Sequence, residues 1–490
     1  MSFSILISAS EAVPFAKSGG LADVVGSLPK HLRDLGHDVR LVMPRYYRVS
    51  REKYCLRALP GVLVVPMGIL GKEYCAVYEG VMPDSDIPVY FLEHEGYYGR
   101  GGLYDEGNVE YPDNDRRFIF LSKATLELCK MLDFHPDIIH AHDWHTAAIP
   151  LLLNTAYRSD SHVGKAASVL TIHNMQYQGS FPPATMEILD VGWEQYTFLG
   201  VEKDDRVNLL KGGLYNATIL NTVSEGYADE IKTPLYGCGL ENVLRERSAD
   251  LFGILNGVDY SEWAPETDRY ITANYSADDM QGKTLCKEEL QKAMGLPVKA
   301  ETPLFGVVSR MVKQKGVDFL AAALPELLKL DLQLVMLGEG EPWAHFYFGG
   351  MAAMNPAKMK VIVGYDNALS HRIEAGADFF LMPSAFEPCG LNQMYSMRYG
   401  TLPIVRATGG LDDSVENFDE SRLQGDGFKF RDLTAGALFD TVGWAVHTWY
   451  HRKEAIKSLR YNAMQKRFTW EGAAAKYEEL YKLAISRLRL

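Results

Sequence analysis

The 490-residue sequence lacks the cysteine pattern of a disulfide-bonded or zinc-stapled protein. Its six cysteines are scattered singly and form no Cys-x-x-Cys pair. Neither a structural zinc site nor a disulfide scaffold is therefore expected, and a reducing compartment such as the cytoplasm fits this usage. The cysteines are Cys55, Cys75, Cys129, Cys238, Cys286 and Cys389.

Long apolar runs and an excess of basic residues are also absent. No run approaches the ~18 apolar residues of a membrane span, so no membrane partner is expected. The first residues carry no positive charge before Lys17 and are interrupted by Glu11, which favours a first β-strand over a signal peptide. Fifty Lys and Arg against 63 Asp and Glu leave a net charge of −13, which argues against a nucleic-acid binder. A small anionic ligand needs only a few local cations and stays compatible with this charge.

Apolar runs alternate with helix-like segments along the whole chain, which predicts βαβ units and parallel sheets covered on both faces. A polar, turn-rich stretch begins at Asn256 and separates two such series. We therefore expect an α/β protein with two doubly wound, Rossmann-like domains, 1–255 and 256–470, and a largely helical end from Ala435. The predicted strands lie at 3–8, 39–43, 88–92, 137–141, 168–172, 217–221 and 252–255, and then at 305–309, 332–337, 361–363, 379–382 and 402–405.

Ligands of doubly wound sheets bind at the carboxyl ends of the strands, so the loop after each predicted strand is a candidate site. The first such loop contains Lys17, Gly19, Gly20 and Asp23. Glycines let the backbone approach a ligand, a helix start offers free amides, and Lys17 adds a mobile cation suited to a diphosphate. The loop matches neither G-x-G-x-x-G nor a P-loop, and a plain glycine turn with a surface lysine is the alternative.

The segment His140-Ala-His142-Asp143-Trp144-His145 closes a later predicted strand. His140 and His142 share one face of that strand, because side chains alternate between its faces. These groups are candidates to hydrogen-bond a polar ligand such as a sugar. A zinc site and a buried structural cluster are the alternatives. His173 and Asn174 end the next strand in the same half and extend the candidate site.

In the second half, Arg310 and Lys315 follow the first predicted strand and precede a helix. A guanidinium fork and a compact ammonium beside a helix start suit the two phosphates of a nucleoside diphosphate. A solvated charge run is the alternative. Glu387 follows another strand and is a candidate acceptor for sugar hydroxyls, with amides near Gly390 for phosphate oxygens. Cys389 is expected to be a small buried residue, since no base adjoins it.

Six motifs together resemble the bacterial glycogen synthases, which with the plant starch synthases form a family of retaining GT-B glucosyltransferases. They occur in order across both halves. They are KSGGLADV at 17–24, HAHDWH at 140–145, TIHN at 171–174, SRMVKQKG at 309–316, FEPCGL at 386–391 and TGGLDDSV at 408–415.

The resemblance implies transfer of glucose from ADP-glucose to the 4-hydroxyl of an α-1,4-glucan. It implies two domains facing across a deep cleft, an acceptor-binding domain at 1–255, a donor-binding domain at 256–470, and a final helix, 471–490, that packs back on the first domain. The implied catalytic residues are Glu387, Arg310, Lys315, His173 and Asp143. The implied substrate-binding residues are Lys17, Gly19, Gly20, Asp23, Tyr104, Asn174, Asn256, Tyr365, Cys389, Gly390 and Leu391.

Within this resemblance, Tyr365 corresponds to the aromatic residue that stacks on the adenine and Tyr104 to a donor-site tyrosine. Arg310 and Lys315 stabilise the departing ADP, so no metal or other cofactor is expected. The partners are then ADP-glucose and glycogen, and a homo-oligomer is compatible with the sequence. UDP-glucose as donor, a non-catalytic sugar-binding protein of the same fold, and a metal-dependent barrel hydrolase are the alternative functions.

Overall fold

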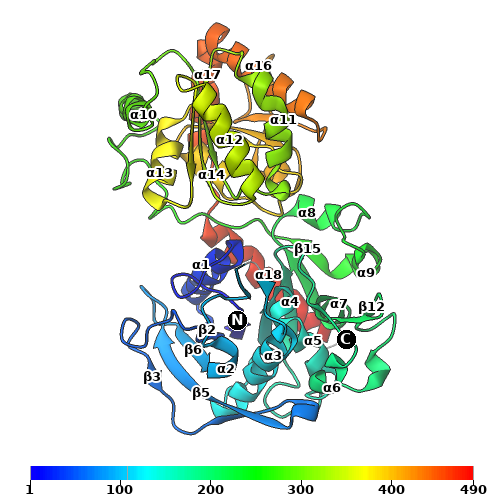
Figure 1. The fold of residues 1–490 in the computed structure, drawn as a ribbon. Helices are drawn as coiled ribbons and strands as arrows, with labels where there is room; N and C mark the ends of the chain where they lie inside the picture. Colours follow the sequence, from blue (N-terminus) through cyan, green and yellow to red (C-terminus); the bar gives the residue numbers. More distant parts are fainter. Residues whose placement is uncertain (1, 108, 489–490) are drawn as a thin grey trace. The chain divides into compact units, whose positions relative to one another are not determined.

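The computed structural model describes residues 2–107 and 109–488 and divides the chain into two compact units. Unit 1 consists of Met1–Val223, Ala228–Ile254 and Trp470–Leu490. Unit 2 consists of Ser224–Tyr227 and Leu255–Thr469. Each unit has its own sheet and helices, as the predicted two-domain α/β class requires (Figure 1). Within the described residues, no helix is both long enough and apolar enough to cross a lipid bilayer.

The sheet of unit 1 has the strand order β15-β14-β10-β9-β1-β2-β6-β5-β3, with β4 paired to β5. The strands are β1 (Ser4–Ser8), β2 (Asp38–Pro44), β3 (Arg57–Ala58), β4 (Leu63–Pro66), β5 (Lys72–Val81), β6 (Pro88–Glu93), β9 (Ile138–His142), β10 (Ala167–Ile172), β14 (Ile219–Thr222) and β15 (Leu251–Gly253). Short strands outside it are β7 (Asp105–Glu106) with β8 (Val109–Glu110), and β11 (Ser180–Phe181), β13 (Arg206–Asn208) and β12 (Glu202–Lys203).

Seven strands of this sheet, β15 through β6, are parallel, as the βαβ alternation predicts. The prediction of a wholly parallel sheet is wrong at one edge, where β5 runs antiparallel to β6, β3 and β4. Unlike the fully buried strands β9, β10 and β14, β5 alternates between buried and part-exposed positions. It therefore lacks the continuous apolar run that marks a central parallel strand.

The helices of unit 1 pack their apolar sides against this sheet and against one another. Helix α1 buries Leu21, Val24, Leu28 and Leu32 at helical spacing. The helices are α1 (Gly20–Asp34), α2 (Glu95–Tyr98), α3 (Asn114–Met131), α4 (Asp143–Thr146), α5 (Ala148–Asn154), α6 (Thr185–Leu189), α7 (Leu209–Asn216), α9 (Glu241–Glu246) and α18 (Trp470–Leu488), while α8 (Glu225–Glu230) contains a boundary between the units.

The last helix, α18, belongs to unit 1, which confirms the expected return of the chain to its first domain. It packs on α1 and β10. The hydroxyl of Tyr481 lies 2.9 Å from His140 Nδ1, and Asn221 Nδ2 donates to the Tyr477 hydroxyl over the same distance. Buried hydrogen bonds thus fix α18 on the strands that carry the histidine motif.

The sheet of unit 2 is parallel throughout, with the order β18-β17-β16-β19-β20-β21. Counted along the chain this order is 3-2-1-4-5-6, the arrangement of dinucleotide-binding folds. The strands are β16 (Leu304–Val308), β17 (Gln333–Gly338), β18 (Met359–Val363), β19 (Phe379–Met382), β20 (Leu402–Arg406) and β21 (Phe428–Phe430). The helices are α10 (Gln281–Ala293), α11 (Val317–Leu327), α12 (Pro342–Met354), α13 (Asn367–Gly376), α14 (Asn392–Arg398), α15 (Gly409–Ser414), α16 (Ala435–His451) and α17 (Lys453–Gln465).

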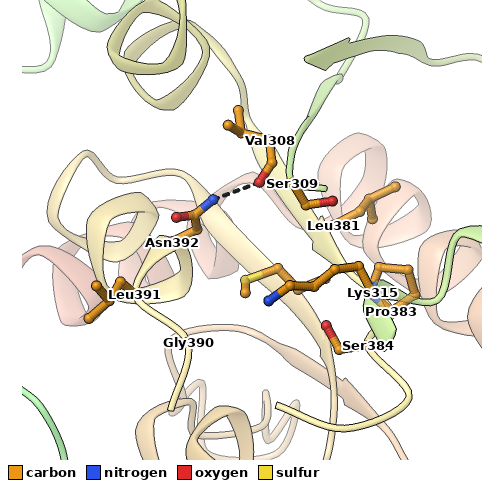
Figure 2. A pocket seen from close by; sticks show the side chains of 10 residues that line it. Val308, Ser309, Lys315, Leu381, Pro383, Ser384, Gly390, Leu391 and Asn392 are labelled. Atoms are coloured by element: carbon orange, nitrogen blue, oxygen red, sulfur yellow. Dashed lines mark hydrogen bonds between the residues drawn. The ribbon is translucent and has the colours of Figure 1, made fainter. Parts of the chain in front are cut away.

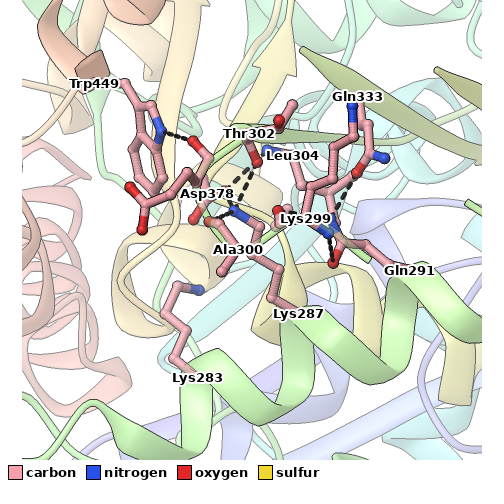
Figure 3. Close-up of polar contacts among 12 residues, drawn as sticks. Lys283, Lys287, Gln291, Lys299, Ala300, Thr302, Leu304, Gln333, Asp378 and Trp449 are labelled. Carbon is pink, nitrogen blue, oxygen red and sulfur yellow. Dashed lines mark hydrogen bonds and ion pairs between the residues drawn. The ribbon is translucent and has the colours of Figure 1, made fainter. Parts of the chain in front are cut away.

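Buried charges tie α10 and α17 to the start of this sheet. Lys287 Nζ lies 2.7 Å from Asp378 Oδ2, and Arg460 reaches the other oxygen of the same carboxylate at 2.6 Å. Figure 3 shows Lys287 reaching from α10 toward Asp378 and the backbone at Thr302. Burial alone would raise the pKa of Asp378, but the two cations hold it below its ordinary value. Asp378 also accepts from the amide of Leu304, so this cluster anchors the first residue of β16.

Candidate functional site

Each sheet has one point at which the strand order reverses. In unit 2 it lies between β16 and β19, and in unit 1 between β1 and β9. Chain connections leave in opposite directions there, so a crevice opens beyond the carboxyl ends of the two strands. The predicted site residues of each unit follow these strands or their neighbours.

A pocket of about 200 Å³ lies at the reversal point of unit 2. Its walls come from the end of β16, the end of β19 and the loop before α14 (Figure 2). Asn392 Nδ2 donates to the carbonyl of Val308 over 2.7 Å and so ties α14 to β16. The lining residues are Val308, Ser309, Lys315, Leu381, Met382, Pro383, Ser384, Gly390, Leu391 and Asn392. The predicted Lys315, Gly390 and Leu391 are therefore brought together.

Lys315, which lines this pocket, pairs through its ammonium with the carboxylate of Glu387, which is not one of the lining residues. The Nζ–Oε2 distance is 2.6 Å, and the Ser384 hydroxyl donates to the same oxygen over 3.1 Å. The Glu387 side chain is 6% exposed and that of Lys315 is 20% exposed. Figure 2 shows Lys315 extending into the pocket between Ser384 and Asn392. The pair places a cation and a hydrogen-bond acceptor side by side in a partly dry crevice, where both act strongly on a polar ligand.

Two glycines allow the loops of this pocket to touch. Gly316 has φ +71°, and a Cβ there would lie 1.8 Å from the carbonyl oxygen of Pro383. At Gly410, in the TGG motif, a Cβ would lie 2.1 Å from the carbonyl oxygen of Cys389. The amide of Gly410 donates to the carbonyl of Glu387 over 3.0 Å. Only glycine fits these contacts, which explains both the KQKG and the TGG motifs by packing.

Cys389 is buried and Asn256 hydrogen-bonds to it. Burial raises the pKa of the Cys389 thiol to about 12, so the thiolate needed for a nucleophile does not form near neutral pH. This supports the expected role of Cys389 as a small packed residue. Asn256 itself is buried and its Oδ1 atom has no hydrogen-bond partner within the described structure.

Arg310 and Tyr365 lie exposed, after β16 and β18 respectively. Arg310 donates to Gln314 Oε1 at 3.3 Å, and no carboxylate of the described residues pairs with it. Tyr365 is 77% exposed, and its hydroxyl donates to Asn367 Oδ1 over 3.0 Å. Both are placed to meet a ligand that extends from the carboxyl edge of this sheet, and neither contributes to the core.

In unit 1, the glycine loop is bound by a buried carboxylate that the sequence reasoning did not single out. Glu11, just beyond β1, accepts from the amides of Ser18 and Gly19 and, over 2.7 Å, from the Ser18 hydroxyl. The Tyr104 hydroxyl donates to Glu11 Oε1 over 2.5 Å and lies 2.7 Å from the Ser10 hydroxyl. The amides of Ser18 and Gly19, which precede the start of α1, are therefore already bound. The anion that binds them is Glu11.

The predicted cation of this loop is also paired. Lys17 Nζ lies 2.7 Å from Asp23 Oδ1, and the Lys17 side chain is 50% exposed. Burial raises the pKa of Asp23 above its ordinary value, and the attraction of Lys17 offsets only part of that rise. The amides of Gly20 and Leu21 start α1 and have no intrahelical acceptor. Lys17 and these amides are the groups of the loop that a ligand phosphate can reach.

Asp143 and His173 meet at the ends of β9 and β10. Asp143 has φ +53°, and its Oδ1 atom accepts from the amides of His173 (2.7 Å) and Asn174 (3.4 Å). Burial raises the pKa of Asp143 to about 7, against these hydrogen bonds, which lower it. Burial also lowers the pKa of His173 to about 3. The imidazole is thus neutral at physiological pH and able to donate or accept a hydrogen bond.

The histidines of the HAHDWH motif differ in whether their ring nitrogens already have hydrogen-bond partners within the described structure. His140 and His142 stack at 4.2 Å, as expected for one strand face. His140 uses both nitrogens, toward Thr171 (2.7 Å) and Tyr481 (2.9 Å), which supports a structural role for it.

His142 Nδ1 lies 3.0 Å from His173 Nε2. His145 stacks on Tyr104 at 4.6 Å, so Tyr104 joins this cluster. His142 Nε2 and His145 Nδ1 are buried without partners within the described structure, a pattern common where a ligand completes a site.

The comparisons with known proteins agree with this geometry. A family model of the starch synthase catalytic domain matches residues 4–246, and the group 1 glycosyl transferase model matches residues 290–460. Glycogen synthase 1 of Geobacter metallireducens is 68% identical over 483 residues, 99% of this chain and 96% of the relative. Glycogen synthase of Treponema denticola is 43% identical and covers 99% of both chains.

A solved structure, the catalytic domain of starch synthase IV from Arabidopsis thaliana bound to ADP and acarbose, superposes with a TM-score of 0.90. It is 34% identical and covers 99% of this chain and 100% of its own. Sucrose-phosphate synthase from Thermosynechococcus elongatus shares the fold, with a TM-score of 0.60 at 16% identity over 98% of both chains. The two-domain GT-B-like architecture is thereby confirmed, and the chain belongs to the glycogen and starch synthase family of hexosyltransferases.

Proposed function

We propose that this glycogen synthase homologue transfers glucose from ADP-glucose to the 4-hydroxyl at the non-reducing end of an α-1,4-glucan, with retention of the α-configuration, and releases ADP. The observation that carries the proposal is the pair of Glu387 with Lys315, the cation that lines the pocket of unit 2. It combines, within 2.6 Å, an acceptor for sugar hydroxyls and a cation for phosphate oxygens. A sugar joined to a diphosphate requires both chemistries in neighbouring positions.

The donor nucleotide is assigned to unit 2. Lys315 and the exposed Arg310 follow β16 and supply positive charge to the diphosphate, Arg310 as a two-pronged donor. Tyr365, exposed after β18, offers a ring face for the adenine. The preference for ADP over UDP is supported by the ADP bound in the Arabidopsis starch synthase IV domain.

Glu387 is assigned to hydroxyls of the transferred glucose, and a separate cluster in unit 1 is assigned to sugar hydroxyls. Asp143, His173 and Asn174 form a compact hydrogen-bonding cluster, and the neutral imidazole suits an uncharged hydroxyl. Tyr104 and Glu11 support the neighbouring glycine loop, whose Lys17 is assigned to the donor phosphates. The buried, unpartnered nitrogens of His142 and His145 lie within the same cluster.

The chemical step breaks the bond between the glucose C1 atom and the β-phosphate oxygen and forms a bond from C1 to the acceptor O4. The acceptor proton passes to an oxygen of the departing phosphate on the same face. Charge builds on the diphosphate as the glucosyl centre becomes oxocarbenium-like. Arg310 and Lys315 stabilise that charge because their positions are set before the reaction. In this assignment they supply the charge that a divalent ion supplies elsewhere, so no metal is required.

The test incubates the purified protein with ADP-glucose or UDP-glucose and glycogen, with and without chelator. Released nucleotide and polymer extension are measured together. The proposal requires ADP release that depends on glycogen, lengthening of α-1,4-chains, and rates unchanged by chelator. Faster extension from UDP-glucose would overturn the donor assignment. Binding of either nucleotide sugar without extension would overturn the catalytic assignment.

A further inference from the structure

Helix α12 of unit 2 carries apolar side chains on its solvent side as well as on its core side. Its 13 residues include no Asp, Glu, Lys or Arg. A helix that is apolar all round is normally covered on every side. The core side of α12 is covered, and it consists of Ala344, Tyr347, Phe348, Met351 and Ala352. The other side lies in solvent.

The exposed residues of α12 form one continuous apolar surface, which we call the α12 stripe. They recur at spacings of three and four residues and therefore share one face of the helix. The helix connects β17 to β18, the outermost strand of its sheet, and packs on β18 and beside α11 (Figure 1). The stripe consists of Trp343, Phe346, Gly349, Gly350, Ala353 and Met354.

Packing within this chain does not explain the two glycines of the stripe. A Cβ at Gly349 or Gly350 would meet no heavy atom within 4 Å outside the local helix backbone, in contrast to the glycines of the pocket loops. Alanine stabilises a helix interior more than glycine does, so the fold alone favours alanine at both positions. Glycines at an exposed helix face instead allow another backbone to approach closely.

The composition of the stripe favours a protein partner over a lipid surface or a sugar. A helix that lies on a membrane carries Lys or Arg on its polar side, and α12 has neither. A sugar site combines apolar walls with well-placed polar groups. The one polar side-chain group of the stripe, the Trp343 indole N–H, already donates to Glu341.

The stripe is complementary to a second copy of itself in antiparallel orientation. Its first half is bulky, with Trp343 and Phe346, and its middle and second half contain the small residues. When the midpoint of the contact lies level with Phe348, Phe346 of each copy lies level with Gly350 of the other. Trp343 then lies level with Ala353 of the other copy. Bulky side chains thus face small ones on both sides of a two-fold axis.

The charges next to the two ends of α12 favour the same orientation. Glu339 and Glu341 precede the helix, whereas Lys358 and Lys360 follow it. Antiparallel packing brings the acidic end of each copy toward the basic end of the other, while parallel packing would place like charges together.

The area of the stripe indicates a weak dimer. Phe346 is 87% exposed, Met354 71% and Trp343 40%. At roughly 200 Å² for a large side chain, the stripe offers on the order of 500 Å² per copy. Two copies then bury on the order of 1,000 Å² in total, which is the lower limit of specific interfaces.

We propose that the α12 stripe is the contact surface of a two-fold homodimer, in which two copies of α12 pack antiparallel with their midpoint level with Phe348. The dissociation constant is in the micromolar range. None of the stripe residues is assigned to glucosyl transfer, so the reaction does not depend on the dimer.

The test is sedimentation velocity of tag-free protein from ~1 to ~200 µM. The fraction of dimer should rise with concentration. Phe346→Glu should raise the dissociation constant at least ~30-fold, because two carboxylates would enter an apolar contact. Since the Phe346 side chain is exposed, circular dichroism and glucosyl transfer should stay unchanged. The matched control is Leu285→Glu, at a 51% exposed position on α10, which should dimerise as the wild type does.

A size exchange tests the register. Gly350→Phe alone should weaken the dimer, because the new ring meets Phe346 of the other copy. Phe346→Ala/Gly350→Phe should restore it, since a bulky residue again faces a small one. A double variant no tighter than Gly350→Phe would overturn the antiparallel arrangement.

A wild type that is monomeric at ~200 µM, or a dimer that survives Phe346→Glu, would overturn the proposal. Co-sedimentation with glycogen and with phosphatidylglycerol vesicles tests the other occupants. A monomeric wild type that loses either interaction in Phe346→Glu would assign the stripe to that ligand and not to a second copy.

Discussion

The Lys315 ammonium lies 2.6 Å from the Glu387 carboxylate, and this contact joins the loop after β16 to the loop after β19. The two residues are 72 positions apart in the chain. They meet because β16 and β19 are neighbours at the point where the strand order of unit 2 reverses. Each partner lowers the cost of burying the other.

Glu387→Gln should lower the turnover number about 10²-fold or more and leave the fold intact. The amide has the size of the carboxylate, but it cannot neutralise Lys315 and it replaces one acceptor oxygen with a donor. Initial rates of ADP release in the presence of glycogen measure the effect. The matched control is Glu326→Gln, which removes an exposed carboxylate paired with Lys329 on α11 and should keep wild-type turnover. Wild-type rates in Glu387→Gln would remove this residue from the site.

Lys315→Met should lower turnover by about 10²–10³-fold, because a fixed cation aimed at the departing diphosphate is lost. The variant also leaves the buried Glu387 carboxylate without its cation. Lys329→Met, at an exposed position just beyond the end of α11, is the control. An unchanged turnover number in Lys315→Met contradicts the assigned role.

Glu11→Gln should raise the KM for ADP-glucose and lower turnover by about tenfold. Glutamine offers one acceptor oxygen where Glu11 uses two, so the amides of Ser18 and Gly19 and the Tyr104 hydroxyl lose part of their support. Glu11 acts as a positioning residue, and its effect should appear in KM as well as in turnover. Steady-state kinetics separate the two. The exposed Glu52 provides the control Glu52→Gln, and equal kinetics in both variants would show that Glu11 does not position the loop.

His140 should make the stability of the protein sensitive to acid. Burial lowers its pKa to about 3 in the folded protein, against about 6.5 in an unfolded chain. The folded state therefore resists protonation, and the contribution of His140 is complete above pH 6.5 and is lost as the pH falls toward 3. The loss approaches about 1.4 kcal/mol per pH unit below 6.5.

Urea unfolding at pH 7.5, 6.0 and 5.0 measures this dependence. The midpoint of the wild type should fall with acidification, and that of His140→Gln should fall less. His447→Gln, which alters an exposed histidine on α16, should follow the wild type. Parallel curves for the wild type and His140→Gln would contradict the buried, neutral state of His140.

Asp378→Asn should destabilise unit 2 by about 3–5 kcal/mol, because the buried Lys287 and the part-buried Arg460 then lose their shared carboxylate. Figure 3 shows Lys287 beside Asp378. Thermal or urea unfolding followed by tryptophan fluorescence measures the change. Glu301→Gln removes a carboxylate that is 84% exposed and paired with Lys453, and it should cost less than about 1 kcal/mol. Equal losses in the two variants would show that burial does not determine the contribution of Asp378.

The central strands of both sheets were predictable because buried parallel strands read as short, continuous apolar runs. The whole of β10, for example, is buried, and four of its six residues are apolar. The antiparallel edge formed by β3, β4 and β5 was not predictable in this way, since these strands are partly exposed and β3 and β5 carry polar residues. The return of α18 to unit 1 followed from the family resemblance and not from the helix pattern itself.

The sequence predicts those residues of the candidate site that can be recognised from their position after a strand. Asp143 and His173 stand directly after a strand, and Lys315 and Glu387 lie in the loops that follow β16 and β19. The rule for parallel sheets places such residues at the carboxyl edge of their sheet. Glu11 stands in the same kind of position, yet its importance depends on Tyr104, 93 residues away, and on the fold of the glycine loop. A carboxylate at the end of the first strand is the signal that could have drawn attention to it.

The most direct test of the proposed reaction is the stoichiometry and linkage of transfer from ADP-glucose to glycogen. Radiolabelled glucose incorporated into polymer and ADP released are measured in the same samples, and the product is digested with an exo-acting α-1,4-glucanase. The account predicts one ADP for each glucose added, complete release of the label by the glucanase, and both products formed at least ~10²-fold more slowly with Glu387→Gln. ADP release without incorporation, or label that resists the α-specific digestion, would contradict it.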